Sequence, residues 1–237
     1  MIQTEGIFVG GSAISAPIIG EDFNWSGSDG TYQVLDDGGG NWRIKFLSSG
    51  TFTPLKNMVI DTFLVGGGGG AGSSYCGEGG AGYTTTVRSV VLTANTAYSI
   101  VVGAAGTNGN PSSAGGETTA FTASAAGGKN TSNGTSSSKR PGGAGGSGGA
   151  GYVSPVATTT GGTDGGDGTS SATTGGKGQG TTTREFGEAD GTLYASGGGS
   201  NLTATVSNSG NGGRNGITSI APADGIVVIR QHKEVAA

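Results

Sequence analysis

The sequence predicts an all-β fold, and three observations lead to that expectation. Glycine supplies 54 of the 237 residues, about 23 %, against about 7 % in average proteins. Each glycine inside an α-helix costs about 1 kcal/mol relative to alanine, so long helices are excluded. Short runs of alternating apolar residues indicate strands, and glycines recur every third residue between them. We expect sandwich-like strands that enclose a bundle of extended, left-handed polyglycine II helices, with almost no α-helix.

The first 40 residues differ from the rest in composition. They contain two acidic pairs and the aromatic residues Phe8, Phe23, Trp25 and Tyr32, and they end in a glycine run after Asp37. This composition is typical of a small β-rich segment for attachment or oligomerisation. We therefore expect an N-terminal segment at 1–40, a glycine-rich domain at 41–230 and a C-terminal tail at 231–237.

Strand patterns are clearest between residues 41 and 65. Trp42, Ile44 and Phe46 alternate along the chain and so share one face of a strand. The next run is predicted to place Met58, Ile60 and Thr62 on one face and Val59, Asp61 and Phe63 on the other.

Two further runs, 83–93 and 96–102, are separated by Ala94 and Asn95, which predicts a pair of strands joined by a turn. The apolar run GIVVIR at 225–230 is typical of a central strand that returns to a sheet near the end of the chain.

Glycines at a three-residue spacing lie between these strands. They occur at Gly66, Gly69 and Gly72, at Gly103, Gly106 and Gly109, in the Gly-Gly-X triplets of 142–151, at Gly162, Gly165 and Gly168, and at Gly210, Gly213 and Gly216. The period matches an extended left-handed helix with three residues per turn. Without side chains such helices approach closely and bond through their backbones. A flexible linker is the alternative, but the regular phase favours packing and predicts dihedral angles near φ −75°, ψ +145° for 142–151.

Charge and composition exclude several classes of protein. The chain has 12 basic and 16 acidic residues and a pI near 4.9, which argues against nucleic-acid binding. One cysteine and one histidine exclude an intrachain disulfide and a Cys/His zinc site. The start of the chain has no signal-like pattern and no apolar run is long enough to cross a membrane. We expect a soluble protein that does not insert into membranes.

Catalytic residues are weakly indicated. His232 lies in the polar tail and is interpreted as solvated. Carboxylates occur in two glycine-rich stretches, at Asp164 and Asp167 and at Glu185, Glu188 and Asp190. Glycoside hydrolysis needs two facing carboxylates with separated pKa values, and a polar glycine-rich setting does not supply that. These carboxylates are therefore interpreted as solvated turn residues, and we expect no enzyme activity and no cofactor.

Polar segments lie between the glycine tracts at 129–140, 152–160, 169–174 and 201–208. We expect them to emerge as loops at an end of the bundle, where recognition is usually located.

Several motifs in order resemble the glycine-rich domain of bacteriophage and prophage tail proteins, especially those of Gram-positive hosts. They are FLV at 63–65 before five glycines, AYSIVVG at 97–103, TTTREFGEADGTLYASGGG from Thr181, and the closing GIVVIR. The resemblance covers about 41–230. It implies a tail-fibre or tail-tip protein of the virion, made in the bacterial cytoplasm, with other tail proteins as partners. Similar adhesins stack polyglycine helices and display variable loops, although this chain differs in its N-terminal segment.

The resemblance also divides the aromatic residues. It implies that Phe186 and Tyr194 are framework residues between glycine layers. Candidates for binding host cell-surface carbohydrate lie in the polar segments: Lys139, Arg140, Tyr152 and Asn201. Tyr152 suits stacking on a sugar ring. Lys139 and Arg140 suit anionic wall polymers, and a solvated charge pair is the alternative for them.

Two function classes remain open at this point. One is a receptor-binding adhesin, favoured if the polar loops gather at one end. The other is a purely structural virion component such as a fibre shaft, neck or head fibre, favoured if they are scattered. An antifreeze protein is a weaker third alternative, because an ice-binding face would need short regular repeats. A chain with so few apolar residues gains little from its own core, so we expect a cyclic homo-oligomer, most simply a trimer.

Overall fold

The computed structural model describes residues 22–28, 30–133, 142–150, 180–199, 204–215 and 219–231. In these residues the regular elements are strands and two short 3₁₀ turns, and no α-helix occurs. The strands form two antiparallel sheets of five strands each, which confirms the all-β fold class.

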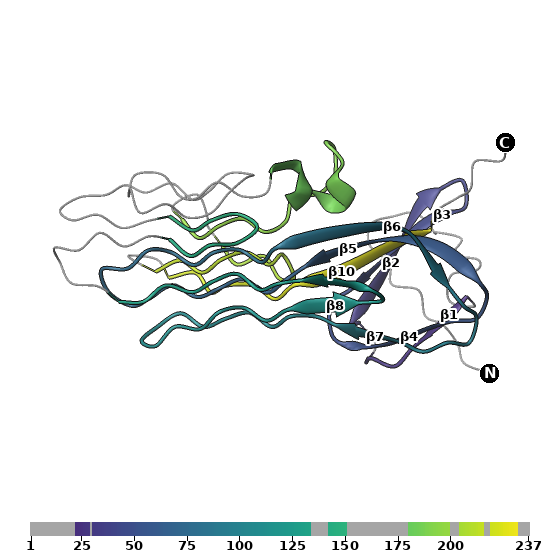
Figure 1. The fold of residues 1–237 in the computed structure, drawn as a ribbon, viewed down its shortest axis with the longest axis horizontal. Helices are drawn as coiled ribbons and strands as arrows, with labels where there is room; N and C mark the ends of the chain where they lie inside the picture. Colours follow the sequence, from purple (N-terminus) through teal and green to yellow (C-terminus); the bar gives the residue numbers. More distant parts are fainter. Residues whose placement is uncertain are drawn as a thin grey trace.

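The strand order is mixed along the chain (Figure 1). The first sheet has the order β1 (Phe23–Trp25), β4 (Gly50–Pro54), β7 (Tyr98–Val101), β8 (Thr118–Ala120) and β9 (Ala123–Ala125). The second has the order β2 (Tyr32–Gly38), β3 (Asn41–Phe46), β10 (Ile226–Gln231), β5 (Met58–Val65) and β6 (Thr84–Leu92). The N-terminal residues thus contribute one strand to each sheet, while their predicted role in attachment stays a prediction.

Apolar side chains from the two sheets share one core, which makes the pair a sandwich. Phe52 and Ile100 enter it from the first sheet and are fully buried. The predicted alternation of Trp42, Ile44 and Phe46 is confirmed, because all three are buried in this core while Arg43 and Lys45 point the other way.

β10 is the predicted central strand. It lies between β3 and β5, with Ile229 opposite Ile44 on one side and Thr62 on the other. Ile229 faces the sandwich core, whereas Val228 faces a second core on the outside of the sheet. A strand buried on both faces explains why its sequence is continuously apolar.

The predicted pairing of the runs 83–93 and 96–102 is wrong. β6 pairs with β5 in the second sheet, whereas β7 pairs with β4 and β8 in the first. The turn between them is a corner that crosses from one sheet to the other, with Asn95 at φ +58° donating its N–H to the carbonyl of Pro54. Local alternation predicted both strands but carried no information on their partners.

The glycine segments continue from the ends of the strands and extend to one side of the sandwich, rather than lying between its sheets (Figure 1). The register of the sheet continues with them. Val65 faces Thr84 where β5 pairs with β6, and beyond the strands Gly66 donates to the carbonyl of Tyr83 and Gly69 to that of Gly80. Strand pairing therefore sets the phase of the glycine segments. We call their assembly the bundle.

The hydrogen bonds of the bundle repeat every three residues. In segment 77–83, the N–H groups of residues 78 and 81 donate to carbonyls of 150 and 147. Those of 79 and 82 donate to 213 and 210, and those of 80 and 83 to 129 and 126. One segment thus bonds three neighbours in rotation, as a threefold extended helix requires. The packed interpretation of the tracts is confirmed for the described residues.

The approach of the segments leaves no room for side chains. A Cβ built on Gly67 lies 2.1 Å from the carbonyl oxygen of Ala104, and one on Gly79 lies 2.0 Å from that of Gly69. Among the described bundle glycines, only Gly109 and Gly210 have φ between +20° and +160°. The predicted dihedral angles of 142–151 stay a prediction, although the described residues 142–150 are bonded into the bundle and not helical.

A second core covers the outer face of the second sheet. The two 3₁₀ turns, Gly180–Thr183 and Glu185–Gly187, lead into this cover. Phe186 and Tyr194 are buried there with ring centroids 6.1 and 5.6 Å from Phe63 of β5. Their framework role is confirmed. The two rings pack against side chains of the second sheet and against Ala81 of the glycine segment 77–83.

Gly115→Ala tests the packing of the bundle. Its Cβ would lie 2.0 Å from the carbonyl oxygen of Gly67, so we expect the free energy of unfolding to fall by at least about 2 kcal/mol. Ala114→Ser, at the exposed neighbouring position, should change it by less than about 0.5 kcal/mol. Urea unfolding measures both, and equal stability of the two variants would contradict close packing.

Candidate functional site

The turns between glycine segments meet at the end of the bundle that is remote from the sheets (Figure 1). Gly72 lies there, seven residues beyond Val65, and forms an isolated bridge with Gly109. At about 3.1 Å per residue, this end lies about 20 Å from the sandwich. We define the tip as residues 72–77, 108–112, 130–133 and 214–215.

Asn108 is a junction between three segments of the tip. Its Oδ1 accepts the N–H of Ala71 at 2.8 Å, and its Nδ2 donates to the carbonyls of Arg214 at 3.1 Å and Ile220 at 2.8 Å. The side-chain amide of Asn215 donates in turn to the carbonyl of Gly72. At the tip, side chains therefore add hydrogen bonds to backbone pairs such as that from Gly109 to Ala71.

Asn133 and Thr131 fix the turn at 72–77. Asn133 accepts the N–H of Ser73 at 2.7 Å and donates to its hydroxyl at 3.0 Å. Buried Thr131 accepts the N–H of Gly72 at 3.0 Å and donates to the carbonyl of Gly77. The described start of the polar segment 129–140 is therefore part of the framework of the tip.

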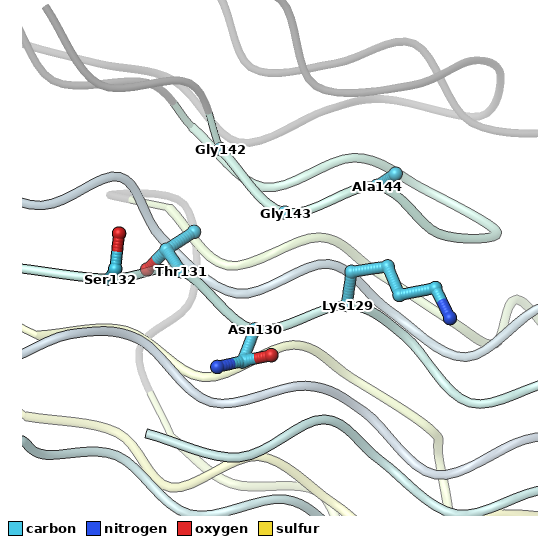
Figure 2. A pocket seen from close by; sticks show the side chains of 7 residues that line it. All are labelled: Lys129, Asn130, Thr131, Ser132, Gly142, Gly143 and Ala144. Carbon is cyan, nitrogen blue, oxygen red and sulfur yellow. The ribbon is translucent and has the colours of Figure 1, made fainter. Parts of the chain in front are cut away.

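A shallow groove of about 260 Å³ runs between residues 129–132 and 142–144. Figure 2 shows Thr131 and Ser132 directed towards the 142–144 side, with Asn130 on the other side of its segment, where its amide donates to the carbonyl of Ser112. The groove is lined by backbone and mostly small side chains, which offer both hydrogen bonds and apolar contact.

Glu78 is largely buried directly behind the tip. Its Oε2 accepts the N–H of Asn215 at 2.6 Å. Burial raises the pKa of Glu78 to about 7, against the opposing effects of that hydrogen bond and of Arg214. Burial and the Glu78 charge likewise raise the pKa of Cys76 to about 11, so its thiol is protonated at neutral pH and donates to the carbonyl of Gly72 at 2.9 Å.

The prediction that these carboxylates are solvated is wrong for Glu185, which is buried. Its side chain is buried and pairs with Arg43 at 2.5 Å and Lys45 at 3.3 Å, and it accepts the hydroxyl of Tyr194. Burial opposes the charge on Lys45, but the contacts with Tyr194 and Glu185 hold its pKa above the ordinary value. Asp190 is exposed and fits the prediction, whereas Glu188 is partly buried and pairs with Arg230 at 2.8 Å. Asp164 and Asp167 lie outside the described residues.

Asp61 is a second buried carboxylate on the same outer face. It pairs with Arg88 at 3.2 Å and Arg230 at 3.1 Å and accepts the N–H of Ser89. Arg230 also lies 4.2 Å from the ring centre of Phe186. The ion pairs of Asp61 join β5 to β6 and β10 within the sheet, whereas those of Glu185 join the cover to β3, so both carboxylates have structural partners.

The receptor-binding candidates Lys139, Arg140, Tyr152 and Asn201 lie outside the described residues. The described end of the segment 201–208 lies along the bundle and not at the tip: Thr205 donates to the carbonyl of Ala221, and Asn208 to those of Leu47 and Gly225. The sequence analysis did not single out Tyr75, which is 45 % exposed in the tip turn. The signal available was the polar break SSYC between two glycine runs.

Two other kinds of site are absent from the described residues. They contain no group of three or more His, Cys, Asp or Glu side chains arranged to hold a metal ion. They also contain no helix with the length and hydropathy of a membrane span.

Glu185→Ala tests the ion pairs beneath the cover. It leaves half-buried Lys45 without its carboxylate, so we expect the free energy of unfolding to fall by about 3 kcal/mol. Glu188→Ala is the control, because its carboxylate is 41 % exposed and surface pairs contribute less than about 1 kcal/mol. Chemical unfolding of the two variants compares them, and similar losses would refute the distinction.

The pKa of Glu78 predicts a pH dependence of stability. A folded-state pKa raised from 4.5 to about 7 means that the folded protein takes up a proton first, so stability rises as the pH falls from about 7 to 4.5. Glu78→Gln keeps an acceptor for Asn215 and should stabilise the fold at pH 8 by up to about 3 kcal/mol. Glu117→Gln is the control, because Glu117 is exposed. Thermal unfolding at pH 5 and pH 8 measures the melting temperature of both variants. Equal changes in melting temperature for the two variants would contradict the prediction.

Comparison with known proteins places this arrangement in a family. No curated protein matches the chain. A family model described as a glycine-rich domain matches residues 47–230, more than three quarters of the chain, from the end of β3 to β10. The chain therefore belongs to the glycine-rich domain family.

Proposed function

We propose that the chain is a non-enzymatic bacteriophage tail-fibre or tail-tip protein, an adhesin that binds host cell-surface carbohydrate through polar loops. The observation that carries this proposal is the tip: several polar turns meet about 20 Å from the sandwich, at the end of a bundle bonded through its backbone. The sequence resemblance to bacteriophage tail proteins also supports the proposal and adds the virion as the location.

The bundle supports recognition because backbone N–H and C=O groups hold its glycine segments together. Turn residues outside the anchoring set of Asn108, Thr131 and Asn133 can therefore carry different side chains without loss of the framework. The tip turn 72–77 consists of glycine, serine, tyrosine and cysteine. The serine hydroxyls of this turn are short donors and acceptors suited to sugar hydroxyls.

One observation favours the second candidate, a purely structural virion component. The described end of segment 201–208 is bonded along the bundle and at its junction with the sandwich, whereas the described start of 129–140 lies at the tip. These two polar segments are therefore not gathered at one end. We assign recognition to the tip side and regard the 201–208 side as a surface for contacts within the virion.

Several copies would act together in this proposal. We propose a cyclic homo-oligomer, most simply a trimer, attached to other tail proteins through the N-terminal region. Weak binding of each tip to carbohydrate would then be raised by avidity.

Loop replacement tests the adhesin. Residues 134–140 and 152–160 are replaced separately by Gly-Ser loops of equal length, which leaves the framework residues Thr131 and Asn133 in place. We expect at least tenfold weaker adsorption to host cells with normal particle assembly, and the point variants Tyr152→Ala and Arg140→Ala separate stacking from charge.

The control for loop replacement is Leu55→Ser, an exposed residue between β4 and β5 at the sandwich. It should leave adsorption unchanged. Wild-type adsorption by every loop variant would reject the adhesin and leave the structural component, whereas failed assembly would identify the loops as virion contacts.

A further inference from the structure

A pocket of about 350 Å³ lies on the outer face of the second sheet, next to the cover. β2 contributes Asp37, β3 contributes Arg43 and β10 contributes Arg230, while the cover contributes residues from 185 to 192. Its volume is near the lower limit of small-molecule sites, which suits a ligand of the size of one sugar unit. We call it the cover pocket. The cover lies near the junction of the bundle and the sandwich, remote from the tip (Figure 1), so this pocket is separate from the tip turns.

The two guanidinium groups of the cover pocket are held in place by carboxylates. Arg43 donates to Asp37 through Nε at 2.8 Å and Nη2 at 2.7 Å, and to buried Glu185 through Nη1 at 2.5 Å. Nη2 of Arg230 pairs with Glu188 at 2.8 Å. A guanidinium carries five N–H groups, and both side chains are partly exposed, so each keeps donors for a ligand. The ion pairs thus orient these donors before any ligand arrives.

Hydrogen-bond acceptors come from the turn of the cover. Asp190 and Thr192 line the pocket and are exposed, and neither side chain has a hydrogen bond or an ion pair within the described part of the chain. The backbone of the turn is fixed independently of them. Glu185 donates its N–H to the carbonyl of Thr192 at 2.9 Å, and Gly191 donates to that of Glu188 at 2.9 Å. An ordered turn therefore presents a carboxylate and a hydroxyl that the fold itself does not use.

The mixture of donors and acceptors indicates the class of ligand. An anion would use only the guanidinium donors, which are already paired with carboxylates, and it would be repelled by Asp190. An amine would use only the acceptors and would lie beside two guanidinium charges. A hydroxyl group donates and accepts, so neighbouring hydroxyls of a sugar can accept from Arg43 or Arg230 and donate to Asp190. The lining therefore favours a neutral sugar.

We propose that the cover pocket binds one neutral pyranose unit of a surface polysaccharide. Asp190 and Thr192 bond its hydroxyls, and the remaining N–H groups of Arg43 and Arg230 donate to its oxygens. The inference rests on the proposed adhesin function and deepens it, because it adds a second carbohydrate site on the side of the molecule. Two sites of weak affinity on one chain would raise binding to a polymer through avidity.

Asp190→Ala combined with Thr192→Ala tests the cover pocket. Because neither side chain bonds another described residue, the thermal midpoint of this double variant should match that of the wild type. Its affinity for neutral pyranosides, with galactose and N-acetylglucosamine as probes, should fall at least about tenfold. In the wild-type chain these sugars should shift the NMR signals of the Gly191 and Thr192 amides, and the cationic glucosamine and the anionic glucuronate should bind more weakly.

Glu117→Ala combined with Thr122→Ala is the matched control. It also removes one carboxylate and one hydroxyl from exposed positions, but these flank β8 in the other sheet. The control variant should bind the sugars as the wild type does. The wild-type NMR signals locate the site whatever the stability of either variant.

The outcomes distinguish the cover pocket from the adhesin. Wild-type affinity of the Asp190 and Thr192 double variant, or NMR shifts confined to the tip turns, would overturn the pocket and leave the adhesin intact. Preferential binding of glucosamine or glucuronate would overturn the neutral ligand. Absence of sugar binding by the wild type would also overturn the pocket. Adsorption to host cells is measured in parallel, and its absence as well would reject both proposals.

Discussion

The backbone hydrogen bond between neighbouring glycine segments is the interaction on which the rest of the molecule depends. Because successive N–H groups in 77–83 point to three neighbours in rotation, each inner segment is fixed by several others. That geometry needs a distance at which a Cβ on Gly79 would lie 2.0 Å from a carbonyl oxygen. Glycine is therefore the close-packed residue of this bundle, although it marks flexibility in a linker.

The sandwich supplies what the bundle lacks, a side-chain core that selects one register. Val101 faces Thr119 where β7 pairs with β8, and the same alignment continues with Gly116 bonded to Ala104 and Ser113 to Thr107. Polyglycine segments have no side chains to define their alignment, so a slip by three residues would preserve their bonds. Strands with buried residues such as Ile100 and Phe52 remove that ambiguity before the glycine segments begin.

Features determined by neighbouring residues were predictable from the sequence, and those determined by distant residues were not. Alternation predicted β3 and β10, and the three-residue period predicted the bundle, because both patterns repeat along the chain. The different sheets of β6 and β7 depend on partners elsewhere. Glu185 is buried by Arg43, 142 residues away, and the tip joins Asn108 to Arg214, so neither left a local signal.

The same constraint decides where the molecule can carry specific chemistry. Inside the bundle nearly every position next to a neighbour must be glycine or alanine, so its sequence cannot encode recognition. The outer cover is committed to ion pairs that attach it to the sheet, from Glu185 to Arg43 and from Glu188 to Arg230. Turns are the places where side chains have room, and the tip turns have theirs fixed by Asn108, Thr131 and Asn133. A turn residue outside that network can change without disturbing the backbone hydrogen bonds of the bundle, which is the arrangement that a changeable binding surface requires.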